Sequence, residues 1–150
     1  MSLSEQIDAE LKRSMKARAA ARTSVLRSLK AALRNAAIDK GGADYQLSDD
    51  EALAVVRKQA KQREDSIASY RQGGREDLAA SERAELEIIG EFLPAALGAD
   101  ELKQLVSAAI SETGAKDRSQ MGAVMKLLQQ RAAGRADGRA LSAEVQRQLG

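Results

Sequence analysis

The chain contains neither cysteine nor histidine. Without cysteine it has no thiolate nucleophile and no disulfide, and without both residues it lacks the usual zinc ligands and the imidazole general base. These absences exclude most familiar catalytic arrangements. We therefore expect no catalytic residue, no metal site and no cofactor.

Long apolar runs are also missing. No stretch approaches the roughly 18 apolar residues of a membrane span or of a signal-peptide core, so we expect a cytoplasmic protein that does not contact membranes. Hydrophobic residues make up 43% and charged residues 31% of the 150 positions, which is too apolar for a disordered chain and sufficient for one modest core or two small ones.

Charge is distributed unevenly along the chain. Residues 1–34 hold eight Lys or Arg and three Asp or Glu, a net of +5. Residues 35–98 hold eight and thirteen, a net of −5, and residues 99–150 hold eight and six, a net of +2. A basic segment followed by an acidic one fits either an internally complementary helix pair or an exposed basic face.

Apolar residues recur at spacings of three and four, which predicts amphipathic helices. A first helix runs from about Ser4 and a second carries the apolar stripe from Val25 to Ala36. Ser48 with Glu51 three residues later forms a capping box that begins a long third helix. Pro94 ends a fourth helix, because the residue before a proline disfavours the α conformation.

Three short helices are predicted after this proline, over residues 100–113, 119–132 and 139–149. No stretch shows the two-residue alternation of a strand. The fold class is therefore all-α, with a domain boundary near residues 94–99.

The segment GRADG at 134–138 has two open interpretations. It is either a helix–helix turn, with Gly134 as C-cap and Asp137 as N-cap of the last helix, or a loop that presents backbone amides and Arg135 or Arg139 to a phosphate.

Several segments together resemble the GatB/YqeY family, small proteins related to the C-terminal tail of the B subunit of the tRNA-dependent amidotransferase. They read RSLKAAL at 27–33, KQREDSI at 61–67, GREDL at 74–78, ELEIIGEFLP at 85–94, MG at 121–122 and GRADG at 134–138. The resemblance implies an N-terminal helical domain, residues 1–96, dominated by a long helical hairpin, and a C-terminal three-helix bundle, residues 97–150.

The resemblance also implies tRNA as a partner, beside a tRNA-processing or aminoacylation enzyme. Arg27, Lys30 and Arg34 with Lys12 and Lys16 would merge into one basic stripe if their helices are adjacent, although each also suits a solvated face. The residues that we predict to contact RNA are Lys30, Arg34, Lys61, Arg63, Lys126, Arg131, Gly134, Arg135, Asp137, Gly138 and Arg139. Because the chain has only three aromatic residues, we expect contacts to the RNA backbone and recognition of the RNA shape to contribute more than base stacking.

The related amidotransferase brings the label of a carbon–nitrogen ligase with glutamine as amido-N-donor. That reaction needs ATP-dependent activation of a carboxyl group, and this chain shows no glycine loop before a lysine and no nucleophile with its base. We expect catalysis to belong to the complex rather than to this chain. The alternative function is a helical protein–protein adaptor without a nucleic-acid role, and a monomer is the expected state.

Overall fold

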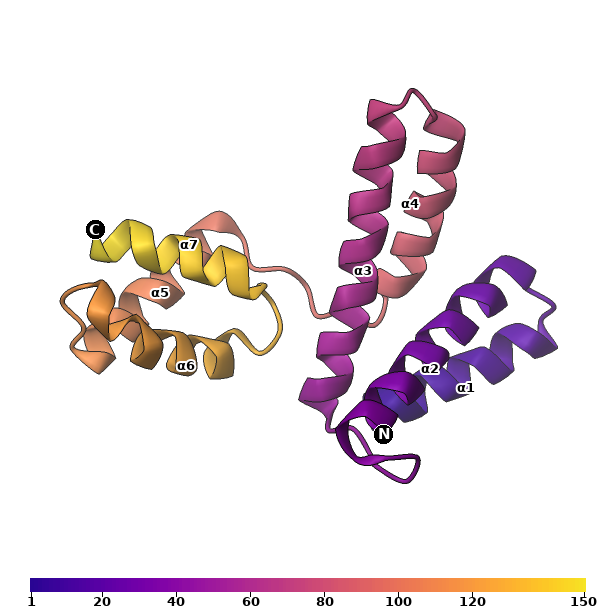
Figure 1. The fold of residues 1–150 in the computed structure, drawn as a ribbon, viewed down its shortest axis with the longest axis horizontal. Helices are drawn as coiled ribbons and strands as arrows, with labels where there is room; N and C mark the ends of the chain where they lie inside the picture. Colours follow the sequence, from indigo (N-terminus) through magenta and orange to yellow (C-terminus); the bar gives the residue numbers. More distant parts are fainter. The chain divides into compact units, whose positions relative to one another are not determined.

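The computed structural model describes residues 1–150 and contains helices but no strand (Figure 1). This confirms the all-α fold class. The chain forms two compact units, Met1–Leu93 and Pro94–Gly150, each with its own apolar core.

The first unit consists of two helical hairpins. Helices α1 (Leu3–Lys16) and α2 (Ala20–Gly41) form one hairpin, and α3 (Asp49–Gln72) and α4 (Glu76–Gly90) form the other. Both are visible in Figure 1. Their apolar stripes meet in one core, in which each fully buried Leu or Ile contributes on the order of 1.5–3 kcal/mol. The buried members are Ile7, Leu11, Val25, Leu26, Leu29, Leu33, Ala52, Val56, Ala60 and Ile89.

The start of α3 confirms the predicted capping box. The Ser48 hydroxyl accepts from the Glu51 backbone N–H at 3.1 Å, and the Glu51 carboxylate accepts from the Ser48 N–H at 3.0 Å. Glu51 also pairs with Lys40 at 2.8 Å and accepts from the Tyr45 hydroxyl at 3.0 Å. Lys40 first and Ser48 next lower the pKa of Glu51 to about 2, so one carboxylate holds together the loop between α2 and α3.

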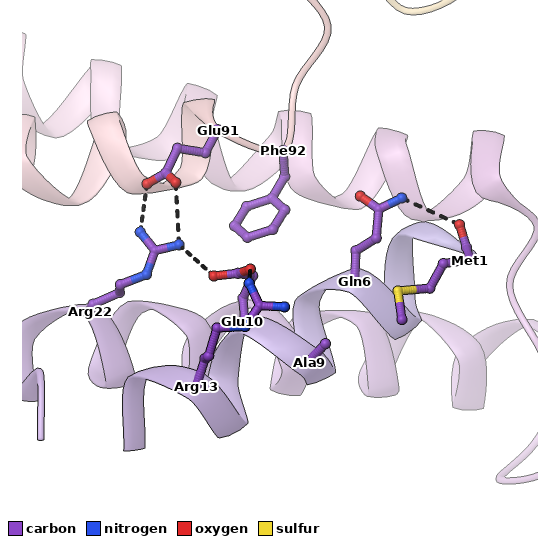
Figure 2. Close-up of a pocket in the computed structure, with 8 residues that line it drawn as sticks. All are labelled: Met1, Gln6, Ala9, Glu10, Arg13, Arg22, Glu91 and Phe92. Atoms are coloured by element: carbon purple, nitrogen blue, oxygen red, sulfur yellow. Dashed lines mark hydrogen bonds and ion pairs between the residues drawn. The ribbon is translucent and has the colours of Figure 1, made fainter. Parts of the chain in front are cut away.

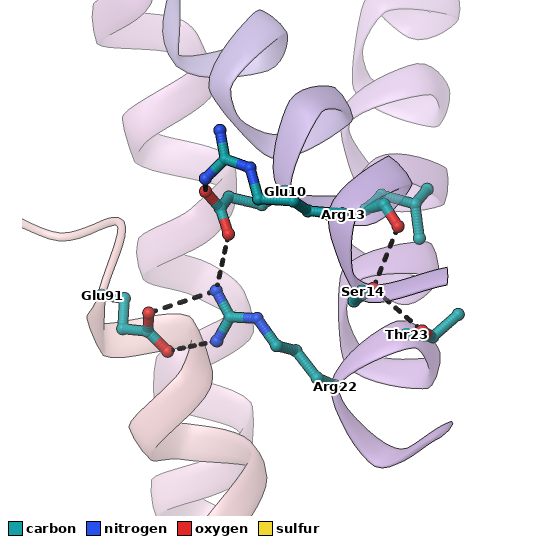
Figure 3. A network of polar contacts seen from close by, with 7 residues as sticks. Glu10, Arg13, Ser14, Arg22, Thr23 and Glu91 are labelled. Carbon is teal, nitrogen blue, oxygen red and sulfur yellow. Dashed lines mark hydrogen bonds and ion pairs between the residues drawn. The ribbon is translucent and has the colours of Figure 1, made fainter. Parts of the chain in front are cut away.

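The turn between α1 and α2 is short and tightly held. The hydroxyls of Ser14 and Thr23, both buried, are hydrogen-bonded at 2.8 Å, and Ser14 also donates to the Leu11 carbonyl at 3.0 Å (Figure 3). Arg18, in the middle of the turn, has a φ of 54°, the left-handed region that few non-glycine residues adopt. The backbone N–H groups of Arg18 and Ala19 donate to the carbonyls of Met15 and Ser14, at 3.2 and 3.0 Å, within this turn.

Arg22, on the first turn of α2, connects the two hairpins. Its guanidinium donates to both carboxylate oxygens of Glu91, at 2.6 and 3.2 Å, and to Glu10 on α1 at 3.1 Å (Figure 3). Such a bidentate pair fixes orientation as well as distance. The hydrogen bond to Glu91, more than that to Glu10, raises the pKa of Arg22 above its ordinary value.

The second unit is a three-helix bundle of α5 (Ala99–Thr113), α6 (Met121–Ala132) and α7 (Gly138–Leu149), with a 3₁₀ turn at Arg118–Gln120 before α6. The predicted helices match these bounds within two residues. Glu144 faces the bundle and accepts from Arg147 at 2.6 Å and Gln148 at 2.9 Å. Arg147 first, and Gln148 next, lower the pKa of Glu144 to about 2.

Candidate nucleic-acid interface

The loop at residues 133–137 is a helix–helix turn with an N-cap. Asp137 accepts from the Ala140 N–H at 2.7 Å and caps α7, as predicted. The C-cap of α6 is Ala133, with φ 48°, rather than Gly134, with φ 82°. The prediction was wrong by one residue because the turn uses two consecutive left-handed residues, and glycine supplies the second without a Cβ penalty. Gly138 is the first residue of α7.

Arg135 binds the segment that precedes α5. Its Nε donates to the Ala95 carbonyl at 3.0 Å, and its guanidinium pairs with Glu101 at 3.3 Å. The Arg135 carbonyl in turn accepts from the Leu97 N–H at 2.9 Å. The predicted phosphate contact of Arg135 stays a prediction, but its side chain already has two partners within the unit.

The other cations around this loop differ in their partners. Arg131 pairs with Glu112 at 2.5 Å across the bundle. Lys126 and Arg139 are exposed and form no ion pair. Of the predicted residues in this unit, these last two present a charge that no carboxylate neutralises.

The predicted residues of α3 have acidic neighbours as well. Lys61 pairs with Asp65 one turn later at 3.2 Å. Arg63 has only 14% of its side chain exposed and lies 4.0 Å from Glu85 on α4. Its guanidinium also donates to Gln59 at 3.0 Å and to Ser28 on α2 at 3.5 Å. Arg63 therefore links three helices of the first unit.

The hairpin of α1 and α2 has a different charge distribution. Between Glu10 and Asp39 the chain carries no Asp or Glu and eight Lys or Arg residues: Lys12, Arg13, Lys16, Arg18, Arg22, Arg27, Lys30 and Arg34. Arg13 and Arg22 pair with Glu10, and Lys30 pairs with Asp8 at 3.1 Å. The remaining five are exposed and form no ion pair. We call these five, Lys12, Lys16, Arg18, Arg27 and Arg34, the hairpin cations.

Two of the hairpin cations form a row along α2. Arg27 and Arg34 are seven residues apart, so they lie on the same face of the helix about 10.5 Å apart along its axis. Lys30 lies one turn from each and pairs with Asp8 of α1 at 3.1 Å. The row therefore has one carboxylate beside it, at its middle residue, while Arg27 and Arg34 form no ion pair.

Sequence reasoning named Arg27, Lys12 and Lys16 as members of a basic stripe but missed Arg18. The sequence feature that could have identified Arg18 is the absence of Asp and Glu over residues 11–38. No residue within seven positions of Arg18 in the chain is acidic, so Arg18 has no local carboxylate to pair with.

A hollow of about 330 Å³ lies on another side of the hairpin, against the end of α4 (Figure 2). Arg13 and Arg22 line it together with Glu10 and Glu91, and Phe92 and Gln6 complete its wall. The two cations there are paired with the two acids. Each of the two arginines in this hollow therefore already has a carboxylate partner.

No group of three or more Asp or Glu residues is placed to hold a metal ion. None of the helices combines the length and the apolar character that crossing a lipid bilayer requires.

A family model described as Yqey-like protein matches residues 4–149. The chain belongs to this family. The YqeY-like chain is also 33% identical over 128 residues to "Altered inheritance of mitochondria protein 41, mitochondrial" of Clavispora lusitaniae. That match covers 83% of this chain and 72% of the relative.

Proposed function

We propose that this YqeY-like protein binds structured RNA, with tRNA as the partner, as an accessory to tRNA-dependent amidation or aminoacylation in the cytoplasm. The observation that carries the proposal is the stretch of residues 11–38, which contains no Asp or Glu and in which the hairpin cations have no carboxylate partner. Phosphate is the anion that occurs in closely spaced rows on a nucleic acid, and Lys and Arg side chains that neutralise it release counterions.

The distribution of charge supports a binding surface better than the net charge does. The whole chain has a net charge of only +2, so a general attraction to nucleic acid is weak. The hairpin concentrates its positive charge on an exposed row that includes Arg27 and Arg34. A local field of this kind steers an anionic partner to one face.

The predicted cations that already have a carboxylate partner form a second set of proposed RNA contacts. Lys30, Lys61 and Arg131 each pair with one acid at the surface. Exposed ion pairs of this kind contribute only about 0–1 kcal/mol, so a phosphate can replace the carboxylate at small cost. Their contribution to binding is expected to be smaller than that of the hairpin cations.

The test measures the affinity of the full chain for total tRNA and for an equal mass of duplex DNA at several salt concentrations. Binding that prefers tRNA and weakens with salt supports the proposal. The variants Arg27→Gln and Arg34→Gln are expected to weaken binding and to reduce the slope of log K against log salt by about 0.7–0.9 for each lost phosphate contact.

The matched control is Arg75→Gln. Arg75 is an exposed arginine of the same unit and pairs with Asp77 at 3.2 Å, so this variant removes the same charge outside the hairpin. It is expected to leave affinity and slope unchanged. Equal losses of tRNA affinity in all three variants would indicate a nonspecific effect of charge. If tRNA does not bind at physiological salt, the adaptor function takes the place of this proposal.

A further inference from the structure

A second hollow, of about 470 Å³, lies at the turn between α1 and α2. We call it the turn hollow, and its lining residues are Met15, Arg18, Ala20, Thr23, Ser24 and Arg27. Its volume lies within the range of about 300–1,000 Å³ that is typical of small-molecule sites. Thr23, one of the lining residues, is hydrogen-bonded to Ser14 at 2.8 Å.

The charge of the turn hollow is of one sign. Arg18 and Arg27 are both exposed and form no ion pair, and no acid lines the hollow. Glu10, the nearest acid in the chain before the turn, is already paired with Arg13 and Arg22. Two arginines without a carboxylate between them favour a phosphate group.

The wall of the turn hollow is also apolar at one point. Met15 is 49% exposed, although it follows the same four-residue spacing as the buried Ile7 and Leu11. Methionine sulfur makes favourable contacts with aromatic rings, and guanidinium groups stack on nucleobases. The exposed Ser24 hydroxyl supplies a hydrogen-bonding group beside them.

The geometry points to a subsite for one unpaired nucleotide of the bound RNA in the turn hollow. Its base covers Met15, and its phosphate contacts Arg18 and Arg27. This inference rests on the proposed function and goes further: with such a subsite, the protein prefers RNA loops, bulges and single-stranded ends over duplex RNA. In an A-form duplex the bases are stacked and paired, and a hollow of this size admits a base only when it is splayed out.

The experiment compares tRNA with a blunt RNA duplex of equal length, using the full chain and the variant Met15→Gln. This substitution changes no charge and replaces an exposed side chain, so folding is preserved and circular dichroism checks it. The expected result is a loss of affinity for tRNA of up to about tenfold, the upper end of what a sulfur–aromatic contact contributes. Affinity for the duplex and the salt slope for tRNA should not change.

Ile38→Gln is the matched control. Ile38 is 46% exposed on α2 and lies outside the turn hollow, so its substitution is expected to leave both affinities unchanged. Arg27→Gln, in contrast, should weaken both and also reduce the salt slope, because its phosphate contact does not depend on the base.

The outcomes separate the two proposals. If the full chain binds tRNA with the expected salt dependence but Met15→Gln binds equally well, the nucleotide subsite is refuted and the proposed function stands. If tRNA does not bind, both fail. If Met15→Gln instead loses binding to phosphatidylglycerol vesicles and not to tRNA, the turn hollow contacts a lipid surface and the subsite is refuted.

Discussion

Replacing Arg135 tests whether it contacts RNA or holds its own unit together. Its bond to the Ala95 carbonyl, at 3.0 Å, involves a charged donor, and a bond of this class has a net value of about 1.5 kcal/mol. Its pair with Glu101 has both side chains exposed, by 40% and 60%, and adds about 0.5 kcal/mol or less. Arg135→Ala should therefore destabilise the attachment of residues 95–97 by about 1–2 kcal/mol.

The assay is amide hydrogen exchange of the full chain, followed at Leu97. The Leu97 N–H donates to the Arg135 carbonyl at 2.9 Å, and this backbone bond is still available in the variant. A loss of about 1–2 kcal/mol in local stability speeds exchange at Leu97 by roughly 5- to 30-fold.

Arg135→Lys separates charge from geometry. Lysine keeps the positive charge but lacks the planar guanidinium that reaches both Ala95 and Glu101. We expect rapid exchange at Leu97 in this variant and tRNA affinity close to that of the original protein. Unchanged exchange together with a clear loss of tRNA affinity in Arg135→Ala would refute the structural role and support Arg135 as an RNA contact.

Two further predictions concern the second unit. Asp137→Ala removes the N-cap of α7 and should lower the free energy of unfolding by about 1 kcal/mol, measured by urea denaturation; an unchanged midpoint would contradict this. Glu144 has its pKa lowered to about 2, below the ordinary value of about 4.3, so its contribution to stability is present above that ordinary value and is lost as pH falls towards 2. Glu144→Gln should flatten the loss of stability over this range in an acid titration followed by circular dichroism, and an identical acid titration would show that the pairing contributes nothing.

The parts of the fold that could be predicted depend on residues near one another in the chain. Helix periodicity, the capping box of Ser48 with Glu51 and the N-cap at Asp137 all involve spacings of four residues or fewer. The pair of Lys61 with Asp65 has the same short spacing. These features are visible in the sequence because a helix brings such residues together in any context.

The partners of several candidate residues could not be predicted in this way. Arg135 bonds to Ala95, 40 residues earlier, and Arg63 contacts Ser28, 35 residues earlier. Nothing in the local pattern indicates these contacts, because they depend on how the helices of each unit pack. The left-handed conformation of Arg18 was likewise not predicted from the sequence.

The positions of the acidic residues distinguish the candidate surfaces better than the number of basic residues does. The Gly134 loop and the middle of α3 both have cations, but Arg131, Arg135 and Lys61 have carboxylates within reach. The last acid of α1 is Glu10, which is already paired with Arg13 and Arg22, and α2 has no acid before Asp39. A surface that keeps cations without partners retains its full attraction for an anion. This is why the hairpin, rather than the glycine loop, is the face on which the RNA proposal is tested.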